Sequence, residues 1–377
     1  MKLFRLGLLS ASVALTLLPV AHAQSLTQLY EMARNYDASY QSARSLYKAN
    51  VSKADQATAQ LLPTVNLGTT TTRSQTDFRG DNPALDGPAY KRWYLTNNAT
   101  LTAVQPLYRP ANMAVYLQSS KILGQAMAQL VTAEQDLMVR VSQAYFDVLT
   151  AQDSLAFVQA QKAAVAEQLA SAKRNFEVGT ATITDTREAQ ARFDLVTAQE
   201  IATDNDLRVK TVALELLVGK TGLKPKQLQT AKGLPPVDGQ GVDGWIAQSE
   251  QAHPAIALAR ANLDIAKLET EKAIAGHKPT LDLTLGYNAQ KNINGTSIGL
   301  VATGSNQINV ASAGVSFNLP LFAGTATQNR IRETTALEEK ARIDLEGAQR
   351  QVAQATRTAY LGLQSGLGQV KAYEAAE

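Results

Sequence analysis

The segment Asn175-Phe176-Glu177-Val178-Gly179-Thr180-Ala181-Thr182-Ile183-Thr184-Asp185 interrupts the longest helical stretch of this 377-residue chain. Gly179 can adopt the left-handed conformation that ends many helices, because glycine has no Cβ to clash with the backbone. Asp185 stands where the next helix is expected to start, and spacing alone favours it as the N-cap. The segment therefore predicts the tip of a helical hairpin.

The two helices on either side of this tip differ in how they bury their apolar residues. The first has apolar residues at three-four spacing and could extend from about residue 111 to 155 before the hairpin. The second carries a narrow, alanine-rich stripe flanked by polar residues, which favours a helix in the wall of a water-filled tube. The stripe consists of Ala191, Leu195, Ala198, Ala202, Val209, Val212 and Leu216, interrupted by Asn205.

The chain repeats itself with a period of about 215 residues. Pro63-Thr64 matches Pro279-Thr280 at an offset of 216, and Pro106-Leu107-Tyr108 matches Pro320-Leu321-Phe322 at an offset of 214. We therefore expect a tandem duplication. Its predicted parts are a first repeat at 24–218, a Gly/Pro-rich linker at 219–244 and a second, incomplete repeat at 245–377.

The incomplete second repeat follows from the alignment of Tyr360 with Tyr145. On this alignment Glu377 corresponds to about residue 162, so the second repeat stops before its own hairpin. We expect a longer chain to carry about sixty further residues that supply a second hairpin.

Each repeat also predicts a pair of strands between its helices. Apolar residues alternate with polar ones after Pro63 and Pro279, and the helical period returns after Pro106 and Pro320, so these four prolines mark predicted strand-helix junctions. Loops are expected at 79–88 and 290–306. The alternating positions are Val65, Leu67, Thr69 and Thr71, then Ala99, Leu101 and Ala103, then Leu281, Leu283, Leu285 and Tyr287, and finally Ala313, Val315 and Phe317.

The N-terminus predicts a signal peptide at residues 1–23. Lys2 and Arg5 precede an apolar stretch, and Ala21-His22-Ala23 fits a cleavage site. Removing these two cations lowers the formal net charge from 36 − 33 = +3 to +1. No basic cluster interleaved with aromatic residues follows, so no nucleic-acid partner is expected. The absence of cysteine excludes disulfides, thiolate metal sites and thiol catalysis.

An enzyme is not expected, and neither are catalytic residues, a metal or a cofactor. Gly295-Thr296-Ser297-Ile298-Gly299 has the spacing of a serine-hydrolase elbow, but no histidine follows it. His253 and His277 lie at opposite ends of one predicted helix. No phosphate-binding glycine loop or carboxylate cluster stands out.

These features together resemble the TolC family of outer-membrane efflux channels. The hairpin tip, followed by Ala189-Gln190-Ala191-Arg192-Phe193-Asp194, is the most specific part of the resemblance, and the strand exits at Pro106 and Pro320 add to it. The resemblance implies an α+β membrane channel in which a long α-helical barrel of coiled-coil hairpins joins a trimeric, twelve-stranded outer-membrane β-barrel. Each chain would contribute four strands from its two tandem repeats.

The resemblance also implies a function and a set of partners. The chain would be the passive outer-membrane exit duct of a tripartite efflux or type I secretion system, porin-like and gated at its periplasmic helical end. Its partners would be two further copies of itself, a periplasmic adaptor (membrane fusion) protein, an inner-membrane transporter and outer-membrane lipid. By position, Val178, Gly179 and Thr180 would contact the adaptor, and Asp185 would help to close the gate.

Physical reasoning supports a membrane barrel independently. Four strands cannot close a barrel alone, and open strand edges in lipid leave backbone groups unpaired at a cost of several kcal/mol each, so oligomerisation is required if the strands lie in a membrane. Trp93 and Tyr94 are possible interface anchors. A soluble sandwich with the same alternation remains the alternative from strand pattern alone. The residues expected to face lipid include Leu101, Ala103, Val315 and Phe317.

Two other functions that need no enzyme remain open at this point: a periplasmic coiled-coil adaptor, and a trimeric surface adhesin with a helical stalk. An adaptor would carry one hairpin flanked by soluble β-domains, without duplicated strand pairs. An adhesin would show shorter repeats and would lack the Val178-Gly179 turn.

Overall fold

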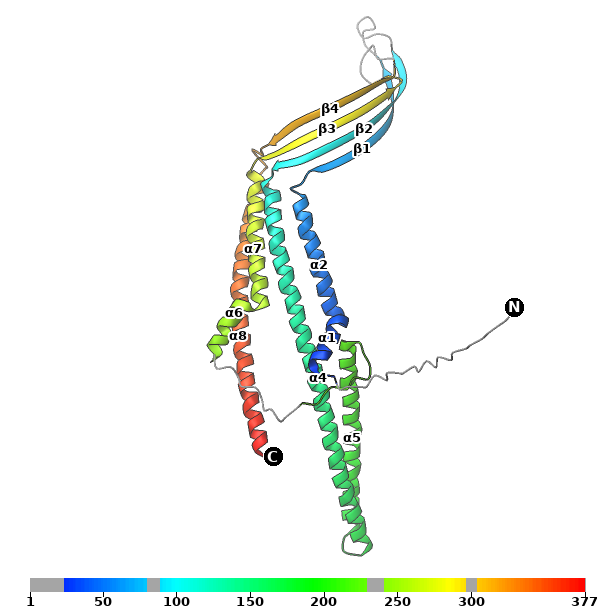
Figure 1. The fold of residues 1–377 in the computed structure, drawn as a ribbon, viewed down its shortest axis with the longest axis vertical. Coiled ribbons are helices and arrows are strands. Elements are labelled where there is room, and N and C mark those ends of the chain that lie inside the picture. The colour runs from blue at the N-terminus through cyan, green and yellow to red at the C-terminus, as the bar shows by residue number, and fades with distance from the viewer. Residues whose placement is uncertain (1–23, 80–88, 229–240, 296–303, 377) are drawn as a thin grey trace, which may run out of the picture. The chain divides into compact units, whose positions relative to one another are not determined.

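The computed structural model describes residues 24–79, 89–228, 241–295 and 304–376. The predicted signal peptide at 1–23 lies outside these described residues, as does most of the predicted loop at 79–88. Figure 1 shows the elements, which are, in chain order, α1 (Leu26–Tyr36), α2 (Ala38–Ala59), β1 (Thr64–Phe78), β2 (Tyr90–Tyr108), α4 (Pro110–Glu177), α5 (Ile183–Val218), α6 (Gly241–Ala252), α7 (Pro254–Ile274), η2 (Ala275–His277), β3 (Thr280–Ile293), β4 (Asn306–Asn318) and α8 (Ala326–Ala376).

Contacts divide the chain into two units. One consists of the described residues within Met1–Gln41 and Ala133–Pro235, and the other of those within Ser42–Thr132 and Pro236–Glu377. The long helix α4 therefore contributes residues to both units.

The strands of the second unit form one antiparallel sheet in the order β1-β2-β3-β4. β2 and β3 pair although they are far apart in the sequence, with Leu101 opposite Tyr287 and Ala103 opposite Leu285. Every residue of β4 is exposed, and β1 is exposed over most of its length. Figure 1 shows the sheet as a single layer. No second layer of the predicted soluble-sandwich alternative is present in the described part of the chain.

The helices of the same unit are held together by a carboxylate on α7. Glu269 accepts hydrogen bonds from Arg330 of α8 at 2.7 Å, from Lys272 at 3.1 Å and from Gln118 of α4 at 3.2 Å. Partial burial by itself raises the pKa of Glu269, but these donors outweigh it and leave the pKa below its usual value. One acidic side chain thus ties three helices from both predicted repeats.

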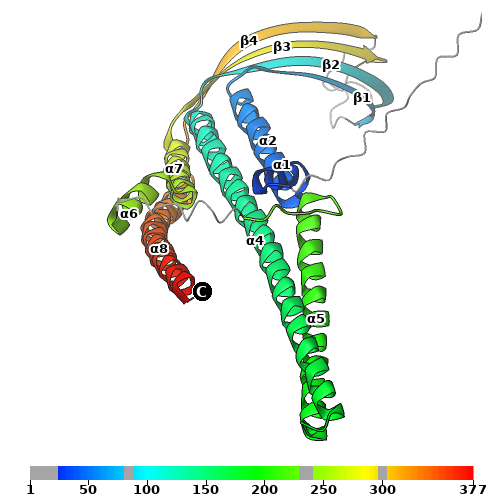
Figure 2. The ribbon, with the colours of Figure 1, turned by 60° about the horizontal axis from the view of Figure 1, so that its bottom comes forward.

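The first unit is built around the C-terminal part of α4, from Ala133 to Glu177. Figure 2 shows α4 and α5 side by side, and α1 lies against them in the same unit. Arg140 donates to both oxygens of Asp37, at 2.9 and 3.1 Å, and this charge-assisted pair lowers the pKa of the Asp37 carboxyl. The buried apolar core of this unit includes Leu29, Ala33, Leu137, Val141, Val148, Leu214 and Val218.

Three element boundaries differ from the sequence-based expectation. α4 runs without a break to Glu177, well beyond residue 155, because nothing in its sequence stops a helix before the Gly179 turn. α6 begins at Gly241, inside the predicted linker. β3 continues to Ile293, inside the predicted loop at 290–306, because Asn292 takes part in side-chain hydrogen bonds with the neighbouring strands.

Candidate functional site

The hairpin tip is a tight turn between α4 and α5. Gly179 adopts a positive φ of 79°, which confirms the prediction that it ends the helix in a left-handed conformation. The carbonyl oxygen of Asn175 accepts from the backbone N–H of Thr180 at 2.8 Å and of Ala181 at 3.2 Å. These bonds satisfy the carbonyl of Asn175 near the end of α4, and in the turn that they close the side chain of Val178 is 73% exposed. The tip presents the exposed apolar side chains of Phe176, Val178 and Ile183 around the Thr180 hydroxyl, which donates to the Asn175 carbonyl at 3.0 Å.

Asp185 lies at the start of α5, but it is not the N-cap. The N-cap is Thr182, and Asp185 is the third helical residue of a capping box. The Asp185 carboxylate accepts from the backbone N–H of Thr182 at 2.7 Å and from its hydroxyl at 2.8 Å. The backbone hydrogen bond and, next, the hydroxyl lower the pKa of Asp185, so this exposed side chain is a carboxylate at neutral pH.

The hairpin behind the tip leaves one side of α5 uncovered. Toward α4, Leu214 is buried and Glu200 pairs with Lys162 at 2.6 Å. On the opposite side the alanine-rich stripe predicted from the sequence is exposed along its whole length, and Leu216 at its end is 75% exposed. The stripe follows a 3.5-residue repeat, which is the period of a coiled-coil seam. α5 thus carries two opposite faces, and only one of them has a partner within its unit.

The strand register places most of the apolar strand residues, from all four strands, on one face of the sheet. Leu67, Leu101, Tyr287 and Ala311 form one continuous row across the sheet, as the pairings show. We call this the apolar face. It includes Val65, Leu67, Ala99, Leu101, Ala103, Leu281, Leu283, Leu285, Tyr287, Ala289, Ala311, Ala313, Val315 and Phe317.

The other face of the same strands, which we call the polar face, is made mostly of hydroxyl, amide and glycine residues. Asn288 donates to the Thr100 hydroxyl at 3.0 Å, and Asn292, which is fully buried, donates to Asn306 at 2.7 Å. The apolar exceptions on this face include Val104, Ile308 and Val310. Its residues include Asn66, Gly68, Thr70, Thr72, Thr96, Asn98, Thr100, Thr102, Thr284, Gly286, Asn288, Gln290, Ser312, Gly314 and Ser316.

The two predicted interface aromatics lie on opposite faces of the sheet. Trp93 is opposite Gln75, on the apolar face, whereas Tyr94 is opposite Ser74, on the polar face. The prediction that both residues anchor the lipid interface therefore cannot hold for both on one face, since successive side chains of a strand alternate. The guanidinium of Arg73 lies over the Trp93 ring, 4.9 Å from its centroid.

Three of the four predicted junction prolines lie between a strand and a helix, and one does not. Pro63, Pro279 and Pro320 lie in the short connections, whereas Pro106 is inside β2. The strand continues to Tyr108 through a register shift after Pro106. A bulge of this kind tolerates a proline, because no ladder hydrogen bond is needed from its nitrogen.

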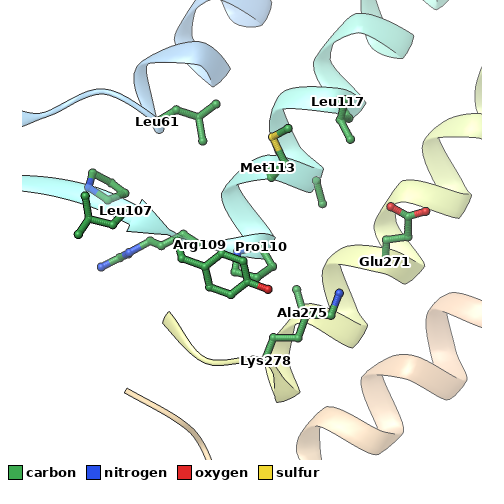
Figure 3. A pocket seen from close by; sticks show the side chains of 12 residues that line it. Leu61, Leu107, Arg109, Pro110, Met113, Leu117, Glu271, Ala275 and Lys278 are labelled. Carbon is green, nitrogen blue, oxygen red and sulfur yellow. The ribbon is translucent and has the colours of Figure 1, made fainter. Parts of the chain in front are cut away.

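A partly apolar cleft marks the place where β2 passes into α4. Figure 3 shows Leu61, Met113 and Leu117 on one side of it and Glu271 and Lys278 on the other. Arg109, which lines the cleft, donates two hydrogen bonds of 2.7 and 2.6 Å to the carboxylate of Asp282 on β3. This bidentate pair ties the strand-helix junction of the first predicted repeat to that of the second.

Side chains that could bind a metal are scattered over the described residues. Among them there is no group of three or more His, Asp or Glu side chains close enough to hold a metal ion. His253 is the N-cap of α7, and His277 is the last residue of the short helix η2 that directly follows α7. The two histidines therefore lie at opposite ends of this helical segment, as predicted. Ser297 of the hydrolase-like motif lies outside the described residues. In the part of the chain that the structure describes, no helix is both long and apolar enough to cross a bilayer.

A curved single-layer sheet with one mostly apolar face and, in the same chain, a long helical hairpin are the parts of an outer-membrane channel that combines a β-barrel with a helical barrel. Comparison with known families agrees: residues 29–220 and 245–377 match the family described as outer membrane efflux protein. The chain belongs to this family. It is an outer-membrane protein that serves as an exit duct for efflux or secretion, and it is neither a periplasmic adaptor nor an adhesin.

Two curated relatives illustrate the range of the family. The outer membrane protein TolC of Vibrio cholerae is 31% identical over 361 residues, which cover 96% of this chain and 79% of the relative. The alkaline protease secretion protein AprF of Pseudomonas aeruginosa is 30% identical over 366 residues, covering 94% and 73% of the two chains.

Solved structures share the fold at lower sequence identity. The outer membrane protein VceC of Vibrio cholerae has a TM-score of 0.68 at 18% identity, covering 92% of this chain and 81% of its own. The MtrE outer membrane channel of Neisseria gonorrhoeae has a TM-score of 0.63 at 18% identity, covering 90% and 75%.

Proposed function

We propose that three copies of this chain close a twelve-stranded barrel in the outer membrane and continue into a helical tunnel in the periplasm. The observation that carries this proposal is the sheet itself. In the described part of the chain, the outer edges of β1 and β4 have no strand partner. Unpaired edges in hydrocarbon are too costly to persist, so neighbouring copies must complete the barrel.

The dimensions of the apolar face support a membrane position. From Leu281 to Ala289 a strand advances about 27 Å, which a tilt of about 40° reduces to about 21 Å of depth, close to the ~25 Å apolar band of outer-membrane barrels. In this position Leu101, Ala103, Val315 and Phe317 face lipid, and the polar face lines the lumen. The helices, at the other end of the strands, lie in the periplasm.

The exposed seam of α5 supports the helical tunnel. A helix in the wall of a tube needs neighbours on two sides, and α5 carries one face packed on α4 and a second heptad face without a partner in its unit. We propose that this second face packs against a neighbouring helix of the assembled wall. The duct is passive and has no catalytic role.

The direct test of this assembly is outer-membrane fractionation followed by electrophoresis with and without heating. A heat-modifiable trimer in the outer-membrane fraction supports the proposal. A monomer, or recovery with the inner membrane or the soluble periplasm, would contradict it.

The hairpin tip is the proposed meeting point with a periplasmic adaptor protein, which in turn connects the duct to an inner-membrane transporter. Val178, Gly179 and Thr180 form the exposed part of the turn, whose conformation is fixed by the bonds to Asn175. Whether the transported substrate is a drug-like solute or a secreted protein is set in this scheme by the transporter.

A charge at the tip should disrupt this contact. Thr180→Asp should lower recovery of the adaptor in a pull-down by about tenfold or more, as expected for a residue at the centre of an interface. Gln199→Asp, at an exposed position on α5, is the matched control and should leave recovery unchanged. Equal recovery with Thr180→Asp would place the contact elsewhere on the hairpin.

We also propose that Asp185 helps to hold the periplasmic end closed. Its carboxylate is ionised and exposed, and capping uses one of its two oxygens, which leaves the other free to accept from a neighbouring hairpin. Asp185→Ala should raise the leak conductance of the assembled channel several-fold in planar bilayers.

A control variant distinguishes a role of Asp185 in closing the channel from its role in capping α5. Thr182→Ala removes the capping hydroxyl but keeps the carboxylate, so it should raise the leak less than Asp185→Ala. An unchanged leak in Asp185→Ala would remove Asp185 from the gate. Equal leaks in both variants would assign Asp185 to capping alone.

A further inference from the structure

The apolar face changes character at the end of the strands that lies away from the helices. The row after Ala289 contains Thr71, Asn97, Lys291 and Gln307, and the next row contains Arg73 with Leu95 and Ile293. Farther along the same face, near the end of the strands, Lys91 lies opposite Asp77. We call Arg73, Lys91 and Lys291 the basic rim.

Among the described strand residues of the apolar face, cations occur only at this end. At the opposite end the apolar face finishes at Leu281 and Phe317, and its described strand residues there include no cation. Arg73, Lys91 and Lys291 are all exposed.

Asp77 is the carboxylate among the described strand residues of this part of the apolar face, and it cannot neutralise all three cations of the basic rim. Asp77 is engaged by Arg79, with 3.4 Å between Nε and Oδ1. The described register neighbours of Arg73 and Lys291 on this face are uncharged residues such as Leu95 and Asn97. Across the described strand residues of the rim, cations therefore outnumber acids.

Of the basic rim, Lys291 lies at the height of the headgroup layer, Arg73 lies just beyond it, and Lys91 lies farther out. Lys291 lies two residues and Arg73 four residues beyond the last apolar row, or about 5 and 10 Å of depth at the tilt used above. The polar layer on each side of a bilayer is roughly 5–8 Å thick. The ring of Trp93, one row farther out on the same face, lies under the guanidinium of Arg73.

Arg73 and Lys291 are close enough to share one headgroup. They lie on β1 and β3, two strand spacings and one row apart, which separates their backbones by about 12 Å. Both side chains are long and flexible, so their charged groups can converge on phosphates between them. The planar guanidinium suits bidentate contact with a phosphate, and the ammonium adds a point charge.

We propose that the basic rim binds the phosphate groups of a phosphorylated glycolipid in the outer leaflet, of the lipid A class. This inference rests on the proposed function, because it requires the apolar face to be in the membrane with the helices on the periplasmic side. The apolar face by itself suits contact with hydrocarbon chains, and the basic rim would add binding to a lipid selected by its negative charge.

The test measures binding of purified trimer in detergent to bisphosphorylated lipid A and to its monophosphoryl form by native mass spectrometry. The wild-type protein should bind the bisphosphorylated lipid about tenfold more tightly, since each cation near an anionic surface adds a modest attraction. The double variant Arg73→Gln with Lys291→Gln should lose this preference while still binding both lipids.

Arg92→Gln is the matched control, because Arg92 lies at the same level on the polar face, near the ring of Tyr90. It should keep the wild-type preference. Equal binding of both lipids by the wild type, or an unchanged preference in the double variant, would overturn the proposal. Failure of the proposed function is distinguishable, since the protein would then form no trimer in the outer membrane.

Discussion

Leu101→Arg should prevent the chain from accumulating as a trimer in the outer membrane. Leu101 lies in the middle row of the apolar face, between Leu67 and Tyr287. An arginine facing lipid near the bilayer midplane costs about 2–4 kcal/mol, and the trimer would carry this cost three times. The measurement is the amount of heat-modifiable trimer in outer-membrane fractions of cells that produce the variant.

Thr100→Arg is the matched control, because it introduces the same side chain one residue earlier. Thr100 lies on the polar face, opposite Gly68 and Asn288. An arginine there should enter the aqueous lumen and lose only the hydrogen bond with Asn288, so trimer should form at near wild-type levels. Normal assembly of Leu101→Arg, or equal loss in both variants, would remove the apolar face from the lipid.

Val209→Asp should have the second largest effect, by breaking the helical wall. Val209 is 57% exposed in the chain and lies in the seam of α5 between Ala202 and Leu216. Burial of such a side chain contributes about 1.5–3 kcal/mol, and an unpaired carboxylate in a packed seam adds a further penalty. We expect the melting temperature of the purified trimer to fall and monomer to appear in size-exclusion chromatography.

The neighbouring Arg208→Asp serves as the control for charge. Arg208 lies on the flank of the seam, where it pairs with Asp204 at 2.7 Å across one helical turn. Such exposed pairs contribute only about 0.3–0.5 kcal/mol, so this larger change of charge should leave the trimer intact. A stable trimer in Val209→Asp would show that the seam has no partner in the assembly.

Much of the fold could be predicted because local signals and global structure agree. Gly179 stands alone between two helical stretches, so its left-handed conformation was the simplest outcome. The alternation after Pro63 and Pro279 identified strands, and the observed register brings the predicted apolar positions of four strands onto one face. The division into tandem repeats stays a prediction.

The errors arose where two residues competed for one role. Thr182 and Asp185 both favour helix starts, and their spacing of three is that of a capping box, in which the first of the pair is the cap. Pro106 was expected to end its strand, yet a bulge lets β2 continue past it. Trp93 and Tyr94 are adjacent in a strand, so alternation alone could have shown that they face opposite ways.

Other features needed coordinates because no sequence pattern announces them. The bidentate pair of Arg109 with Asp282 joins residues 173 positions apart. The three donors around Glu269 come from three helices, and only packing brings them together. The basic rim depends on register, since Arg73 and Lys291 become neighbours only through the pairing of β1, β2 and β3.

The central claim is that one face of the sheet meets lipid and the other meets water, and the cysteine-free chain allows a direct measurement. Single cysteines at positions 98–103 of β2 are introduced one at a time and treated with a water-soluble maleimide in intact outer membranes. Labelling should alternate, with Asn98→Cys, Thr100→Cys and Thr102→Cys reacting and Ala99→Cys, Leu101→Cys and Ala103→Cys protected. Uniform labelling, or the opposite alternation, would contradict the account.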